Sequence, residues 1–107
     1  MVEVKVCGIT RGSDAQEAVS LGATAIGFVF WQKSQRYVTP DVAAAITREL
    51  PSVRTVGVFV NSSVEEVHKV ADIVGLTSVQ LHGDESDDIY KKLAYPVIRA
   101  VGVAGDQ

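Results

Sequence analysis

The sequence predicts an α/β fold in which five parallel strands alternate with four helices, in the order βαβαβαβαβ. Short apolar runs typical of buried strands recur along the chain, and segments whose apolar residues repeat at helical spacing lie between them. Strands that alternate with helices in this way form parallel sheets with right-handed crossovers. The chain has 107 residues, 47% of them hydrophobic, so we expect residues 1–107 to belong to one domain with a packed core.

The five predicted strands cover residues 2–7, 25–30, 54–60, 78–81 and 97–103. In the first strand, alternation places Lys5 and Cys7 on one face and Val4 and Val6 on the other. Gly8 then ends the strand, so Cys7 is expected at the C-terminal edge of the sheet. This edge is where parallel α/β proteins usually carry their chemistry.

The first two helices have different start signals. Ser13 is expected to begin the first helix, and Gly22 to stop it. Thr39 and Pro40 are a favourable N-cap and first-turn pair for the second helix, which ends before Pro51. The apolar stripe of the first helix consists of Ala15, Ala18, Val19 and Leu21.

The last two helices have stronger local signals. Ser63 and Glu66 have the spacing of a capping box, which predicts a helix over residues 64–74 that closes at Gly75. A fourth helix is predicted over residues 84–93, because it is acidic at its start and basic near its end, as the helix dipole favours. His68 lies within the third helix and is expected to be solvated.

Composition excludes several function classes. A net charge of −3 provides no basic field for nucleic acid or an anionic membrane surface. A single cysteine excludes an internal disulfide and a multi-cysteine metal site, and no other residues have metal-ligand spacing. No apolar run reaches membrane-spanning length and no secretory signal opens the chain, so we expect a soluble, cytoplasmic protein.

Four residues near predicted strand ends are candidates for chemistry, each with a structural alternative. Cys7 could react through its thiolate, or be a small buried apolar residue. Arg36, after the second strand, could bind a carboxylate or phosphate, or be a solvated loop charge. Gln80 and His82 share one face at the end of the fourth strand, where His82 could act as an acid or base or have a purely structural role.

Two cations are expected on the same face as Cys7. These are Lys5 on the first strand and Arg99 on the fifth, and a cation close to Cys7 would favour its thiolate form. No glycine-rich dinucleotide fingerprint follows any predicted strand, which argues against a Rossmann fold. A (βα)8 barrel needs eight strands and typically about 250 residues, more than this chain holds.

Four ordered motifs resemble those of the phosphoribosylanthranilate isomerase family. The first, Lys5-Val6-Cys7-Gly8-Ile9-Thr10, is similar to the signature Lys-x-Cys-Gly-[Ile/Leu]-[Thr/Lys] that opens the family's barrel. The second joins Gly27-Phe28-Val29-Phe30 to Lys33-Ser34-Gln35-Arg36-Tyr37, and the last two are Val56-Gly57-Val58-Phe59-Val60-Asn61 and Val79-Gln80-Leu81-His82-Gly83. The resemblance covers the whole chain.

The resemblance implies a fold, a reaction and a site. The fold is a partial (βα)8 TIM barrel, its N-terminal half plus one strand. The reaction is the Amadori rearrangement of N-(5-phosphoribosyl)anthranilate, which needs no cofactor because the imine of this phosphosugar substrate is the electron sink. Cys7 would be the general base and Arg36 would hold the anthranilate carboxylate. Gln80 and His82 would line the pocket.

Two parts of the family's site have no match in this sequence. The general acid is an aspartate on the sixth strand, and the phosphate-binding loops follow the seventh and eighth strands. Two hypotheses therefore stay open. The chain is part of an isomerase that needs a C-terminal half, or it is a non-catalytic half-barrel, an assembly or binding module whose exposed strand edges favour self-association.

Overall fold

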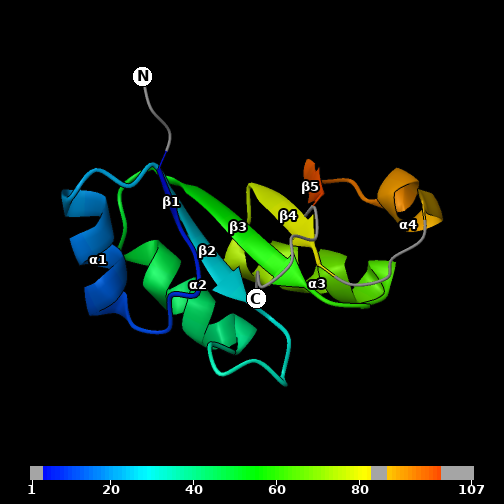
Figure 1. Cartoon of the computed structure of the whole chain (residues 1–107), viewed down its shortest axis with the longest axis horizontal. Coiled ribbons are helices and arrows are strands. Elements are labelled where there is room, and N and C mark those ends of the chain that lie inside the picture. Colours follow the sequence, from blue (N-terminus) through cyan, green and yellow to red (C-terminus); the bar gives the residue numbers. More distant parts are fainter. Residues whose placement is uncertain (1–3, 83–86, 100–107) are drawn as a thin grey trace, which may run out of the picture.

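The computed structural model describes residues 4–82 and 87–99. Five parallel strands form one sheet, and their spatial order β1-β2-β3-β4-β5 is the order of the chain, which confirms the predicted α/β alternation (Figure 1). The elements are β1 (Lys5–Val6), α1 (Gly12–Ser20), β2 (Ala25–Val29), α2 (Pro40–Arg48), β3 (Arg54–Phe59), α3 (Val64–Val74), β4 (Ser78–Leu81), α4 (Asp87–Lys92) and β5 (Val97–Arg99).

The strands differ slightly from their predicted lengths. β2 ends at Val29 and β3 ends at Phe59, each one residue earlier than expected, while β4 has its predicted bounds. The predictions for residues 1–3, 83–86 and 100–107 lie outside the described residues, and they include parts of the first strand, the fourth helix and the fifth strand.

One face of the sheet packs against the helices and forms the core. Side chains at alternate strand positions, such as Ile26, Phe28 and Phe59, are almost completely buried there. They pack with apolar residues of α1, α2 and α3, which follow one another along the sheet (Figure 1). The remaining strand positions belong to the opposite face, which we call the inner face. Its described members include Lys5, Ala25, Gly27, Val56, Val58 and Gln80.

The strand register corrects one expectation about the inner face. Gln80 pairs with Ile98, and Leu81 pairs with Arg99. Because Leu81 belongs to the buried, helix-covered face, the position of Arg99 also belongs to that face. The expectation that Arg99 shares a face with Cys7 is therefore wrong.

Helix ends agree with prediction where a local cap specifies them. The Oγ atoms of Thr39 and Ser63 accept hydrogen bonds from the third residue of α2 and α3, and Gly75 ends α3 with a φ of 82°. α1 has no side-chain cap and begins at Gly12, one residue before the predicted start. Leu21, predicted in its apolar stripe, is 79% exposed beyond the end of the helix.

A polar tether joins α3 to the segment before β5. The Ala94 amide donates to His68 Nε2 at 3.0 Å, so His68 is a hydrogen-bond acceptor rather than a merely solvated side chain. Tyr95 packs its ring 5.8 Å from that of His68 and donates its hydroxyl to Asp72. The hydrogen bond to Asp72, with desolvation and the negative charge of Asp72, raises the pKa of Tyr95 above its usual value.

Within the part of the chain that the structure describes, every helix is too short or too polar to span a bilayer.

Candidate active site

The Cys7 thiol is placed by a glycine on the neighbouring strand. Cys7 directly follows β1 and is exposed. A Cβ atom added at Gly27 would lie only 2.8 Å from Cys7 Sγ and 3.2 Å from its Cβ, so the thiol side chain occupies the space that Gly27 leaves free. Cys7 is therefore not a small buried apolar residue, because its side chain is accessible at the inner face.

The turn after Cys7 is fixed by the same glycine. The amides of Gly8 and Ile9 both donate to the carbonyl oxygen of Gly27, at 3.0 and 3.1 Å. Gly8 has a φ of 83°, a conformation that side chains with a Cβ atom rarely adopt. Glycine at both positions therefore allows the chain to turn sharply immediately after the thiol.

Arg36 lies against this turn. Its Nη1 donates to the carbonyl oxygen of Gly8 at 3.4 Å, and a Cβ atom at Gly8 would lie 3.2 Å from Nη1 and 3.4 Å from Arg36 Cγ. The structure therefore brings Arg36 next to the residue that follows Cys7, although 28 positions separate Arg36 from Gly8. Exposed Arg36 is not simply a solvated loop charge.

The loop after β2 has internal hydrogen bonds that hold Arg36 in place. Ser34 Oγ accepts from the Arg36 amide at 3.0 Å, and the Ser34 carbonyl accepts from the Tyr37 amide at 3.2 Å. Val38 then returns to the sheet by donating to Val29 at 3.1 Å. A serine two residues before the arginine thus fixes the loop that carries the guanidinium.

Gln80 and His82 occupy different environments. Lys5 Nζ donates to Gln80 Oε1 at 2.7 Å, which joins β1 to β4 across the inner face. His82 follows β4 with an exposed side chain, and its amide donates to the Phe59 carbonyl at 2.9 Å. Lys5 is thus bonded to the Gln80 amide group, and His82 is the more accessible of the two predicted pocket residues.

No three His, Cys, Asp or Glu side chains within residues 4–82 and 87–99 gather in a way that could hold a metal ion. The acidic residues Asp84 and Glu85 lie outside the described residues.

Two residues that shape the site were not predicted as site residues. Gly27 makes room for the thiol, and Ser34 holds the loop of Arg36. A signal existed for Gly27, because a glycine inside a strand often marks a close approach of another group. No comparable pattern distinguishes Ser34 from an ordinary loop serine.

Known proteins of one family resemble this chain over its length. The family described as "N-(5'phosphoribosyl)anthranilate (PRA) isomerase" matches residues 4–107. An N-(5'-phosphoribosyl)anthranilate isomerase from Thermotoga neapolitana is 51% identical over 110 aligned residues, covering 100% of this chain and 54% of the relative.

Solved structures show the same similarity. The phosphoribosyl anthranilate isomerase of Thermotoga maritima superimposes with a TM-score of 0.94 and 50% identity, over 96% of this chain and 52% of that one. A phosphoribosyl anthranilate isomerase in complex with reduced 1-(o-carboxyphenylamino)-1-deoxyribulose 5-phosphate has a TM-score of 0.93 and 51% identity, over 96% of this chain and 55% of the other. The chain thus spans about half the length of the relatives it matches, and its fold is a partial (βα)8 barrel.

Proposed function

The chain belongs to the N-(5'-phosphoribosyl)anthranilate isomerase family, and from this we propose that it supplies the N-terminal half of such an isomerase. In this proposal Cys7 is the general base and Arg36 binds the carboxylate of the substrate. The observation that carries the proposal is the contact of Arg36 with Gly8, which places a guanidinium beside the turn that follows an accessible thiol.

The proposed reaction is an Amadori rearrangement of N-(5-phosphoribosyl)anthranilate. A general acid opens the furanose ring to a Schiff base. The Cys7 thiolate then removes the proton from C2, and the electron pair moves into the imine to give an enolamine. Tautomerisation yields 1-(2-carboxyphenylamino)-1-deoxyribulose 5-phosphate. The substrate's own imine accepts the electrons, so the proposed mechanism uses no cofactor.

Each described site residue has one role in this scheme. Arg36 offers a planar guanidinium, which suits bidentate binding of the anthranilate carboxylate. The solved relative that binds a reduced carboxyphenylamino-deoxyribulose phosphate supports a ligand with such a carboxylate. His82 and Gln80 would line the pocket near the end of β4. The general acid and the groups that bind the phosphate would come from a C-terminal half.

Complementation tests the proposal. The 107-residue chain is mixed with the C-terminal half of the Thermotoga maritima relative, and turnover of phosphoribosylanthranilate generated in situ is measured. We expect turnover in the mixture. Replacing Cys7→Ala should lower it by about 10²–10⁴-fold, because general base catalysis typically contributes that much. Arg36→Met should lower kcat/KM by about 10–10²-fold, the value of a charge-assisted hydrogen bond.

Arg48→Met is the matched control for the arginine, because Arg48 is exposed in the last turn of α2 and away from Cys7. It should leave turnover unchanged. Turnover that survives Cys7→Ala in the complemented enzyme would contradict the assignment of the base.

A further inference from the structure

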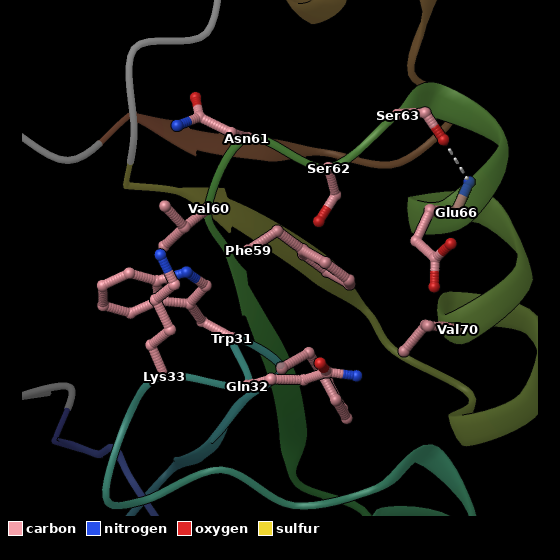
Figure 2. Close-up of a pocket in the computed structure, with 11 residues that line it drawn as sticks. Trp31, Gln32, Lys33, Phe59, Val60, Asn61, Ser62, Ser63, Glu66 and Val70 are labelled. Atoms are coloured by element: carbon pink, nitrogen blue, oxygen red, sulfur yellow. Dashed lines mark hydrogen bonds between the residues drawn. The ribbon is translucent and has the colours of Figure 1, made fainter.

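An open depression lies apart from the candidate active site, between the loop after β2 and the loop that leads into α3 (Figure 2). It has a volume of about 470 Å³. Its charged residues Lys33 and Glu66 are exposed to water, and the Phe59 ring beside them is only 1% exposed. The inner face of the sheet differs, because a charged side chain there is bonded to a residue of the candidate active site.

Lys5 and Gln80 are joined across the inner face. Lys5 Nζ donates to Gln80 Oε1 at 2.7 Å, although β2 and β3 lie between their two strands. Lys5 lies two residues before Cys7 on the same face. The ion pair found in the described residues joins Arg11 to Asp14, so within that part of the chain Lys5 has the amide oxygen, and no carboxylate, as its partner.

The chemistry of this bond fixes the orientation of the Gln80 side chain. A lysine ammonium group has three donors and no acceptor, whereas a glutamine amide has an acceptor oxygen at one end and an NH₂ group with two donors at the other. Lys5 can therefore bond only to the oxygen, and it selects one of the two orientations of the amide. In that orientation the NH₂ group is the end that is free to donate to another group.

The strand register places Gln80 close to the level of the thiol. Gly27 contacts Cys7 and pairs with Val56. Val56 pairs in turn with Ser78, and Gln80 follows Ser78 by two residues on the same face. Gln80 is thus one inner-face position closer to the C-terminal edge than the level of Cys7. A substrate that reaches Cys7 from this edge would lie beside the Gln80 amide.

We propose that Lys5 is a positioning residue, which holds the Gln80 amide so that its NH₂ group donates a hydrogen bond to an acceptor oxygen of the substrate. This role rests on the proposed function, because that function supplies the substrate. Lys5 is exposed in this chain. A C-terminal half would cover the inner face, and the loss of water around the ammonium group would strengthen its bond to the amide.

Kinetics of the complemented enzyme test the role of Lys5. Gln80→Leu removes the donor and should raise KM by about tenfold, the value of one hydrogen bond. Lys5→Met lets the amide adopt other orientations and should raise KM by about fivefold, because only the competent fraction binds substrate. In both variants kcat should stay within about twofold, since the bond is lost from the ground state and the transition state alike.

Lys69→Met is the matched control, because Lys69 is an exposed lysine of α3. It should leave KM and kcat unchanged. A merely structural role for Lys5 would reduce the amount of active enzyme, which lowers kcat at an unchanged KM. That result in Lys5→Met would overturn the proposal.

A double variant shows whether Lys5 acts through Gln80. Once Gln80→Leu is present, Lys5→Met should cause no further rise in KM. Effects that multiply to about 50-fold would mean that the two residues act independently, and would overturn the proposal. Gln80→Glu keeps an oxygen that accepts from Lys5 but has no N–H to donate, so it should raise KM as Gln80→Leu does. A wild-type KM in Gln80→Glu would also overturn the proposal.

The side-chain amide signals of Gln80 test its orientation without turnover. In nuclear magnetic resonance spectra of the 107-residue chain, Lys5→Met should shift the two N–H signals of the Gln80 side chain, and Lys69→Met should not. Unchanged signals in Lys5→Met would overturn the proposal, whatever the turnover of the mixture. Shifted signals together with a wild-type mixture that has no turnover would instead contradict the proposed function and leave the orientation of Gln80 by Lys5 established.

Discussion

The space between Gly27 and Cys7 on the inner face is large enough for one side chain only, and the side chain of Cys7 occupies it. A Cβ atom at Gly27 would meet the thiol at 2.8 Å, closer than real Cβ contacts, and would also meet the Cys7 backbone at 3.2 Å. A larger residue at this position must therefore displace Cys7 and, with it, the turn that carries Gly8. Since Gly8 is in contact with Arg36, a displacement at Gly27 changes the relation between the thiol and the guanidinium.

The first prediction is that Gly27→Ala lowers turnover of the complemented enzyme by about 10²-fold, because misplacement of a reacting group by about 1 Å can cost that much. The rate at which iodoacetamide alkylates Cys7 should change in the same variant. Gly12→Ala is the control, since an added Cβ there meets only Ile46, at 3.9 Å. Equal turnover in the two variants would show that Gly27 does not position the thiol.

The sequence could predict that Cys7 lies at this edge, but not how the residues around it are held. Alternation along the first strand and the break at Gly8 placed Cys7 at the C-terminal edge of the sheet. The contact of Arg36 with Gly8 could not be predicted, because it depends on the path of an irregular loop held by Ser34. Likewise, the Lys5–Gln80 bond joins strands that are not neighbours in the sheet.

At the scale of elements, the segment between α4 and β5 is joined to α3 by polar contacts. Tyr95 donates to Asp72 and the Ala94 amide donates to His68, so two residues of the segment before β5 are bonded to one helix. The hydrogen bond and the charge of Asp72 both favour the protonated phenol, which is why the pKa of Tyr95 is raised.

The hydrogen bond from Tyr95 to Asp72 predicts that the free energy of unfolding depends on pH. A group whose pKa is higher in the folded than in the unfolded protein binds more protons when folded. Its stabilisation is complete below the unfolded value, about 10 for tyrosine, and is lost as pH rises through the folded value. The free energy of unfolding of the wild type should therefore fall, relative to Tyr95→Phe, as pH rises above about 10.

Urea unfolding of both proteins over this alkaline range measures the difference. Tyr37→Phe is the control, because it removes a phenol from the loop after β2 and should keep the dependence of the wild type. Parallel pH profiles for the wild type and Tyr95→Phe would mean that the bond to Asp72 does not stabilise the fold.

Element boundaries could be predicted where one side chain determines them. Thr39 and Ser63 cap their helices as expected, and Gly75 adopts the left-handed conformation that ends α3. α1 has no such signal, because Arg11 occupies its N-cap without a side-chain bond to the helix. Its start and the exposure of Leu21 depend on how the helix packs against its neighbours, which periodicity alone does not specify.

At the scale of the whole molecule, β1 and β5 are the two edge strands of the sheet that the structure describes. Within the described residues, β1 pairs only with β2 and β5 pairs only with β4. Strand edges with unpaired backbone groups are templates for further pairing. The alternation of elements predicted a parallel sheet, but whether other strands close it is not encoded in the local pattern of these 107 residues.

The exposed edges predict concentration-dependent self-association of the chain alone, measured by sedimentation velocity. When an equimolar amount of the C-terminal half of the Thermotoga maritima relative is added, a one-to-one complex should form in place of the self-associated chain. Closure of the barrel would pair both edges at once. The control is the same C-terminal half with a proline inserted into the strand that is expected to pair with β1. This variant should compete poorly with self-association of the chain. A chain that stays monomeric at all concentrations would contradict this prediction.

The strand order described above also bears on synthesis of the chain at the ribosome. Because the spatial order of the strands is their order in the sequence, each new strand can pair with the strand that emerged just before it, and the sheet can grow from β1 toward β5 during translation. The hydrogen bond from Lys5 to Gln80 is different, since it spans 75 positions and can form only after β4 has been added. The contact between the first and the fourth strand is therefore made late, when β4 brings Gln80 to Lys5.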